Sequence, residues 1–409
     1  MTLNWKKDIK LFLISQVLSL FGSALVQYAI SWHITLTTKS GLMMTLAILC
    51  GFLPNFFLSP FAGVWADRYS RKRLLILSDS MIALATLGLA VSFILGYNEL
   101  WLLFVILGIR SLGTAVQTPA VSALIPQIVP EQKLTAVNGI YSSVQAGVAV
   151  LAPALGAVLY SNTSMQNIFL IDVVTAASAV LTLLFLLKIP VHAKALEKQK
   201  SAYLADMKIG FSYVWHNRFL RPFFGYFAWT TFLIAPVAFL TPLLVARSFG
   251  EEVWKLTINE ISFSVGMIIG GIFISKWKGF NNRMRTIALS CLMMGIGTLA
   301  GGIMPNLWLY YGCMLFLGFS IPFLNTPATV LLQEMVEESF MGRVFSVMGM
   351  INSAVMPLGM LVFGPIADHF PIEYLLVITG ALIAVTGFII VRNPNLIKGG
   401  EAKQPVQID

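Results

Sequence analysis

Long apolar segments separated by short polar breaks are the feature that most limits how this chain can fold. A helix of roughly 20 apolar residues crosses the hydrocarbon core of a bilayer and satisfies its own backbone hydrogen bonds there. The sequence therefore predicts an all-α polytopic membrane protein. Twelve such segments can be distinguished, at residues 11–36, 42–65, 74–95, 100–124, 135–160, 165–188, 219–246, 256–277, 285–304, 307–333, 340–367 and 373–391.

The composition agrees with a membrane protein and excludes several other classes. Only 11% of the residues are charged, against about 25% in soluble domains. The net charge of +9 could favour nucleic acid, but the basic residues are confined to the polar breaks, which indicates lipid headgroups and no nucleic-acid partner. No phosphate-binding loop occurs, so nothing indicates nucleotide hydrolysis, and the three dispersed cysteines suit neither a disulfide framework nor a cysteine-based metal site. We expect no enzyme, cofactor or metal site.

The distribution of lysine and arginine predicts the orientation in the membrane. Of the 27 basic residues, Lys39, Arg247 and Lys255 lie in the odd-to-even loops, Arg110 lies inside a segment, and the remaining 23 lie in the tails and the even-to-odd loops. Basic residues accumulate on the cytoplasmic side of membrane proteins. Both termini are therefore expected to be cytoplasmic.

The longest polar stretch, from Lys188 to Arg221, divides the chain in half. Within it, Leu204, Met207 and Phe211 recur at helical spacing, which fits an amphipathic helix on the membrane surface or, equally, a partly structured linker. The expected parts are an N-terminal six-helix bundle at 1–188, a cytoplasmic linker at 189–218, a C-terminal six-helix bundle at 219–391 and a cytoplasmic tail at 392–409.

A short internal repeat supports this division. Thr118-Pro119-Ala120 in the fourth segment recurs as Thr326-Pro327-Ala328 in the tenth, at an offset of 208 residues. Equivalent elements in equivalent segments describe a parallel six-plus-six repeat with the same orientation in both halves.

Charged side chains inside the apolar segments are the strongest functional signal. Arg110 lies near the middle of the fourth segment, where a permanently charged guanidinium needs a counter-ion, water or an anionic substrate. Asp79, Asp172 and Glu260 are acids inside other segments, and each could take up and release a proton. For each acid alone, a structural or solvated role is the simpler alternative; for Asp79 this includes pairing with the basic loop before it.

Polar and aromatic residues suggest where a cavity lies. Gln16, Ser19, Ser23 and Gln27 form one stripe of the first segment, which faces either a water-filled cavity or neighbouring helices. Aromatic residues are dense in the seventh and tenth segments, where some could line an apolar cavity and most should pack. The candidate cavity residues are Gln16, Ser23, Gln27, Trp32, Thr114, Gln117, Tyr226, Trp229, Phe319, Phe323 and Asn325.

The charged loop between the second and third segments marks a membrane face, because its basic residues cannot lie in hydrocarbon. Gly63 would allow close helix approach, and the basic residues could reach carboxylates, helix C-termini or anionic lipid. A simple topology signal explains the loop equally well. Together with two prolines inside helices, the loop supplies the candidate gating residues Gly63, Asp67, Arg68, Arg71, Lys72, Pro153 and Pro357.

This loop, Gly63-x-x-x-Asp67-Arg68-x-x-Arg71-Lys72, resembles the motif between the second and third helices of the major facilitator superfamily, with Ser70 where a glycine is usual. Arg110-Ser-Leu-Gly resembles the fourth-helix motif. Gly147 through Pro153 to Gly156 is a looser match to the fifth-helix antiporter motif, lacking the glycine before the proline. Further stretches narrow the resemblance to the macrolide-efflux branch of bacterial drug exporters, namely 51–54, 110–130, 257–271 and 342–346.

The resemblance implies two six-helix bundles, alternating access, export driven by proton influx, and a cavity lined by segments one, four, seven and ten. It also implies that Asp67 holds a cytoplasmic contact near the start of segment eleven, that Arg71 braces an acidic group and that Arg110 couples protonation to cavity charge. The expected location is the inner (cytoplasmic) membrane of a bacterial cell, as a multi-pass monomer.

Two main functional hypotheses follow. The first is a proton-coupled exporter of amphiphilic drugs, most of all macrolide-type antibiotics, or of a siderophore or other amphiphile. The second is a small-metabolite facilitator on the same fold, which the few fixed charges and many aromatic and methionine residues disfavour. A partner or sensor subunit that transports nothing is a third possibility.

Overall fold

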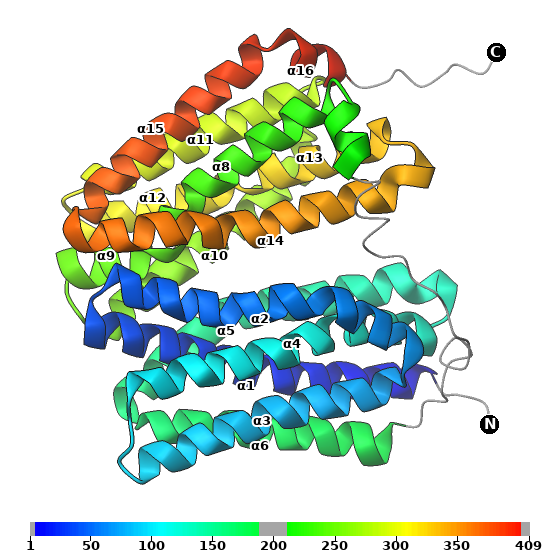
Figure 1. The fold of residues 1–409 in the computed structure, drawn as a ribbon, viewed down its shortest axis with the longest axis vertical. Helices are drawn as coiled ribbons and strands as arrows, with labels where there is room; N and C mark the ends of the chain where they lie inside the picture. Colours follow the sequence, from blue (N-terminus) through cyan, green and yellow to red (C-terminus); the bar gives the residue numbers. More distant parts are fainter. Residues whose placement is uncertain (1–4, 188–210, 402–409) are drawn as a thin grey trace. The chain divides into compact units, whose positions relative to one another are not determined.

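The chain is nearly all helical in the computed structural model, which describes residues 5–187 and 211–401 (Figure 1). Within those residues, twelve segments are long and apolar enough to cross a membrane, as the sequence predicts. The described chain divides into two compact units. Unit 1 contains Met1–Thr38 and Leu46–Ser201, and unit 2 contains Lys39–Thr45 and Ala202–Asp409. The finer boundaries at 188, 218 and 391 stay predictions.

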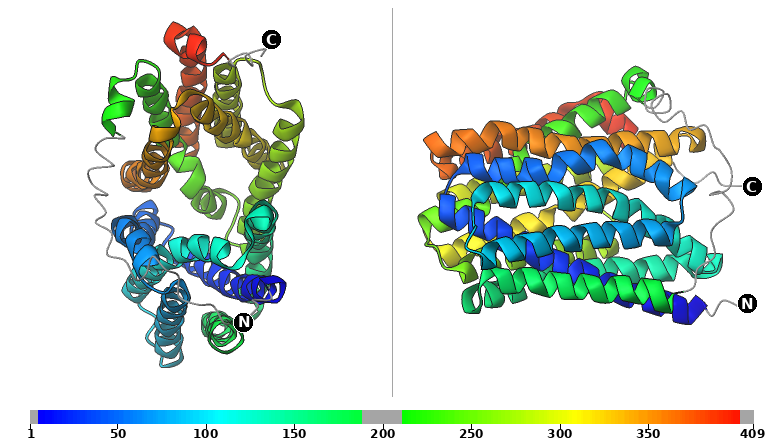
Figure 2. Two further views of the ribbon diagram at one scale, coloured as in Figure 1. Left: turned by 90° about the vertical axis from the view of Figure 1, so that its right-hand side faces the viewer. Right: turned by 60° about the horizontal axis from the view of Figure 1, so that its bottom comes forward.

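Unit 1 is built from long helices that lie side by side (Figures 1 and 2). Within it, α3 packs against α4 and α6, and α1 packs against α5 and α6. The last turns of the sixth span are wound as the π-helical segment η2 (Thr182–Leu186), and a 3-10 turn, η1 (Glu131–Lys133), precedes α5. The helices are α1 (Trp5–Thr38), α2 (Gly41–Arg68, its first residues counted with unit 2), α3 (Arg71–Ile94), α4 (Leu100–Ile128), α5 (Leu134–Asn162) and α6 (Met165–Leu181).

Unit 2 has more, shorter helices, because two of its spans are interrupted. Its most extensive helix pairs are α11 with α15 and α10 with α12. The helices are α8 (Leu220–Phe239), α9 (Thr241–Ser248), α10 (Val253–Trp277), α11 (Arg283–Ile303), α12 (Leu307–Ser320), α13 (Pro322–Met335), α14 (Glu338–His369), α15 (Ile372–Arg392) and α16 (Pro394–Gly399).

The two interruptions differ from the continuous segments expected at 219–246 and 307–333. Span seven breaks at Leu240, between Pro236 inside α8 and the proline in the first turn of α9. Span ten breaks at Ile321, directly before Pro322. Proline has no N–H to donate and its ring crowds the preceding turn, so each break occurs where proline removes a backbone hydrogen bond.

The chain after α15 is partly folded onto unit 2, where a tail was expected. Helix α16 packs against α15 and α11. The Asn282 side chain accepts from the N–H of Met284, 3.0 Å away, and donates to the carbonyl of Ile397 at 2.7 Å. One amide thus caps α11 and anchors α16. In the linker, residues 211–216 are helical, whereas Leu204 and Met207 lie outside the described residues.

Candidate functional site

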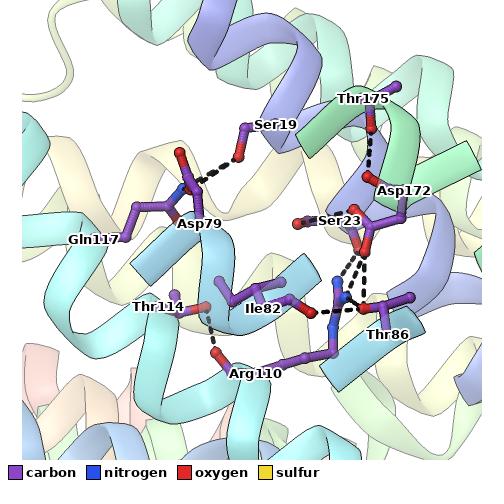
Figure 3. A network of polar contacts seen from close by, with 10 residues as sticks. All are labelled: Ser19, Ser23, Asp79, Ile82, Thr86, Arg110, Thr114, Gln117, Asp172 and Thr175. Carbon is purple, nitrogen blue, oxygen red and sulfur yellow. Dashed lines mark hydrogen bonds and ion pairs between the residues drawn. The ribbon is translucent and has the colours of Figure 1, made fainter. Parts of the chain in front are cut away.

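Helices α1, α3, α4 and α6 of unit 1 carry three of the four charged candidates, namely Asp79, Arg110 and Asp172 (Figure 3). Glycine allows two of the close approaches. A Cβ at Gly113 on α4 would lie 2.5 Å from a carbon of Ile82 on α3, and one at Gly22 on α1 would lie 2.1 Å from Thr175 Oγ1 on α6. Neither position has room for a side chain. The glycines therefore set α3 against α4, and α1 against α6, at the level of the polar groups.

The first part of the site is a buried ion pair. Arg110 Nη1 lies 2.6 Å from Asp172 Oδ2, and the two side chains are 7% and 0% exposed. Thr86 on α3 bridges the pair, because its hydroxyl donates to Asp172 Oδ2 at 3.0 Å and accepts from Arg110. The second guanidinium nitrogen donates to the Ser23 carbonyl at 3.1 Å, and Ser23 Oγ lies 3.5 Å from Asp172 Oδ1. Both charges are therefore paired and hydrogen-bonded, as burial requires.

The second part of the site is Asp79 on α3, which is 1% exposed. Gln117 Nε2 donates to Asp79 Oδ1 at 2.6 Å, and Ser19 Oγ donates to the same oxygen at 3.2 Å. Asp79 Oδ2 has no hydrogen-bond partner among the described residues. Gln16, one turn before Ser19 on α1, is fully buried. Its Nε2 and Oε1 also have no hydrogen-bond partner among the described residues. Within the described part of the chain, Asp79 is thus held by neutral groups, and the basic loop does not pair with it.

The remaining candidate acid lies in the other unit. Glu260 is on α10 and is partly exposed. Among the residues whose burial the structure describes, the charged side chains that are buried are Asp79, Arg110 and Asp172. These three buried charged groups of unit 1 and their hydrogen-bond partners, in the two parts described above, are called the charged network below, and Glu260 lies on a helix of the other unit.

The candidate cavity residues occupy several environments. Thr114 donates to the carbonyl of Arg110 at 3.0 Å, and Trp32 is buried edge-on against Tyr160 with ring centres 6.4 Å apart. In unit 2, Phe319 and Phe323 pack on Phe273. Of the remaining candidates, Gln27, Trp229 and Asn325 are exposed and Tyr226 is partly buried. The structure unites Gln117, Ser23 and Thr114 with the charged network, while Phe319 and Phe323 belong to an aromatic cluster.

The charged loop predicted at residues 63–72 covers the end of α2 and the start of α3, and helix carbonyls hold its basic side chains. Arg71 donates to the carbonyls of Ala66 and Ala123, at 3.1 and 2.8 Å. Lys72 donates to the carbonyls of Leu184 and Leu187, at 3.2 and 2.7 Å. This confirms that a basic residue of the loop reaches a helix C-terminus, where a cation is favoured.

The other gating candidates have less defined environments. Within unit 1, a Cβ at Gly63 would meet no atom within 4 Å, so the expected close helix approach there is wrong for this unit. Arg68 is exposed, and the Asp67 side chain lies outside the described residues. Pro153 and Pro357 lie inside α5 and α14.

Sequence reasoning omitted two members of the network from the site, Ser19 and Thr86. Ser19 belongs to the polar stripe of the first segment, so a signal for it existed. Thr86 follows Asp79 by seven residues, which places both side chains on one face of α3. That spacing could have indicated Thr86, whereas its bridging role depends on the neighbouring helices.

Twelve membrane-spanning segments with paired and unpaired charges in their interior define a polytopic membrane transport protein. The family model of the Major Facilitator Superfamily matches residues 12–360 and, in a second match, 254–404. The chain belongs to this superfamily and is a transporter, not an enzyme.

Two bacterial transport proteins are similar in sequence to most of this chain. The chain is 33% identical to Macrolide efflux protein A of Streptococcus pyogenes over 93% of its own length and 94% of that protein. It is 24% identical to the Staphyloferrin A transporter of Staphylococcus aureus, over 89% and 90% of the two chains. The predicted resemblance to macrolide exporters is confirmed.

Solved structures agree on the fold. A bacterial homolog of the human lysosomal transporter Spinster superimposes with a TM-score of 0.73 at 15% identity, covering 99% of this chain and all of the other. The nucleoside transporter NupG gives 0.72 at 14% identity, covering 95% and 99%.

Proposed function

We propose that this protein is a secondary active exporter of macrolide-type amphiphiles, driven by proton entry. The observation that carries the proposal is the 33% identity to a macrolide efflux protein across nearly the full length of both chains. The charged network adds a physical basis, because acids at membrane depth are a means of binding protons during transport. Arg110, Asp79, Asp172 and Glu260 are the proposed proton-coupling residues.

The proposed mechanism is alternating access in a monomer. Two six-helix bundles with both termini in the cytoplasm would expose the substrate in turn to the two sides of a bacterial cytoplasmic membrane. Proton binding and substrate binding need opposite effects on the same conformational equilibrium for the proton gradient to drive export. Pro153 and Pro357 are proposed to allow helix bending during this exchange.

The direct test is drug susceptibility of a pump-deficient bacterium that expresses the chain. We expect a raised minimal inhibitory concentration for macrolides, with dyes and quaternary ammonium compounds as comparison drugs. Cells that express the chain should accumulate less radiolabelled macrolide than cells that do not, and a protonophore should abolish this difference. Unchanged macrolide susceptibility at normal expression would contradict the assigned substrate.

The resemblance to the Staphyloferrin A transporter supports a second candidate, export of a siderophore or other amphiphile. The test is siderophore release into the medium of an iron-starved producing strain that carries this chain as its sole exporter. Siderophore release together with unchanged macrolide susceptibility would establish the second candidate in place of the first.

The gating proposal for Asp67 has its own test. Asp67→Asn should impair macrolide export with little change in the amount of folded protein, because a contact made in one conformation would weaken while the core is untouched. Immunoblotting of membranes and size-exclusion chromatography check the amount and the fold. Normal export by this variant would reduce the loop to a topology signal.

A further inference from the structure

The buried charges of unit 1 do not balance. Asp79 and Asp172 are two carboxylates, and Arg110 is the one basic side chain buried with them among the residues whose burial is described. An isolated ionised carboxylate is too costly to keep in an apolar interior, so it takes up a proton or pairs with a cation. One carboxylate of this network therefore needs one further positive charge.

The geometry identifies which carboxylate that is. Arg110 Nη1 contacts Asp172 and Thr86, and Arg110 Nη2 donates to the Ser23 carbonyl. Asp79 receives hydrogen bonds from Gln117 and Ser19, which are neutral. Among the described residues, Asp172 on α6 and Tyr141 on α5 also interact electrostatically with Asp79, and neither supplies a positive charge.

A second, independent feature indicates a ligand near Asp79. Its Oδ2 has no hydrogen-bond partner among the described residues, and neither amide atom of the buried Gln16 has one. Gln16 and Ser19 lie one helical turn apart on α1, so they present polar groups to the same side. Buried polar atoms without partners are rare in folded proteins, and such a group marks where a small polar species can bind.

We propose that Asp79 binds the coupling cation of the transport cycle, a single small monovalent cation, and that Ser19 and Gln117 are positioning residues. The cation is a proton or a sodium ion, because a carboxylate beside hydroxyl and amide oxygens can hold either. This inference rests on the proposed function and deepens it, since it selects one acid from the four charged candidates. Asp172 stays an anion locked by Arg110, and Glu260 lies on α10 of the other unit, away from these polar groups of unit 1.

The test measures how cations change macrolide affinity. Purified protein in lipid nanodiscs is titrated with erythromycin at about pH 6 and about pH 7.5, without sodium, and again with added sodium chloride or choline chloride. In antiport, cation and substrate oppose each other, so low pH or sodium should raise the Kd about fivefold or more.

Three matched acid-to-amide variants locate the effect. The quantity compared is the ratio of the Kd at low pH, or with sodium, to the Kd at about pH 7.5 without sodium. Asp79→Asn should make the Kd independent of pH and of sodium, so that this ratio becomes about one. The control is Glu99→Gln, which should keep the full ratio. Glu99 is an exposed acid directly before α4, and its side chain makes no capping hydrogen bond. The third variant is Glu260→Gln, which should also keep the ratio. Infrared difference spectra of Asp79→Asn should lack the protonated-carboxyl band that wild-type protein shows at low pH, if the cation is a proton.

The outcomes separate the inference from the proposed function. A ratio that persists in Asp79→Asn, or that disappears only in Glu260→Gln, overturns the inference and leaves proton-driven export standing. A ratio set by sodium alone and lost in Asp79→Asn supports the inference and contradicts proton coupling. Erythromycin binding that responds to neither cation in wild-type protein overturns the inference.

Discussion

Two polar regions of unit 1 hold a carboxylate in an apolar interior in different ways. Helices α1, α3 and α4 contribute to both regions, and α6 contributes Asp172 to one of them. Asp172 has a guanidinium at 2.6 Å and a bridging hydroxyl from Thr86. Asp79 has an amide and a hydroxyl on one oxygen and, among the described residues, no partner on the other. The first arrangement is complete without any ligand, whereas the second becomes neutral only when a cation binds.

The comparison teaches how burial relates to function in this fold. A paired buried charge is costly to break, so its removal should appear first in stability. An acid without a charged partner contributes little attraction to lose, so its removal should appear in the response to cations. The following variants test this difference on the free energy of unfolding, from the largest expected effect to the smallest.

Asp172→Asn should lower the free energy of unfolding by about 3–5 kcal/mol, because Arg110 would remain buried without its counter-ion. Denaturant titration in mixed micelles measures the loss. Replacing both partners together, with Arg110→Met and Asp172→Leu, should recover most of it, since no unpaired charge remains. If the single variant unfolds like wild-type protein, the pair is not the closed arrangement described here.

Thr86→Val should cost about 2 kcal/mol, because the substitution keeps the shape and removes a hydroxyl that bonds two charged groups. The same micelle titration applies. Thr182→Val serves as a matched control, since that hydroxyl donates only to the backbone carbonyl of Ser178. Equal losses in the two threonine variants would show that the bridge adds nothing.

Asp79→Asn should change the free energy of unfolding by no more than about 1 kcal/mol, because asparagine keeps an oxygen for Gln117 and Ser19 and loses no ion pair. The loss in the free energy of unfolding should therefore be much smaller than for Asp172→Asn, although both variants neutralise a buried acid. A loss as great as that of Asp172→Asn would erase the difference between the two regions.

Glu99→Gln should lie within about 0.5 kcal/mol of wild-type protein, since Glu99 is exposed and its side chain caps nothing. It sets the baseline for neutralising an acid anywhere in the chain. A larger shift in this variant would mean that the assay responds to net charge and would require the other values to be corrected for it.

Much of the fold could be predicted from the sequence, because bilayer thickness fixes the length of each apolar segment. The twelve spans are confirmed, and Arg110, Asp79 and Asp172 stand out as charges in apolar surroundings. The breaks at Leu240 and Ile321 were missed, because span length alone does not show where proline interrupts a helix.

The partners of the buried charges could not be predicted, because they depend on which helices become neighbours. Arg110 and Asp172 are 62 residues apart, and Ser19 and Asp79 are 60 apart. Helical periodicity gives the face on which each residue lies, but not the helix that this face meets. The close approaches at Gly22 and Gly113 decide that, and glycine is too common in membrane helices to identify them in advance.

The most direct measurement of the central claim counts the protons that leave the protein when a macrolide binds. Calorimetric titration with erythromycin in sodium-free buffers of different ionisation enthalpy gives this number at about pH 6, where Asp79 would hold a proton. We expect wild-type protein and Glu99→Gln to release up to about one proton for each macrolide bound, and Asp79→Asn to release none. Release of the same non-zero number of protons by Asp79→Asn and wild-type protein would contradict the account.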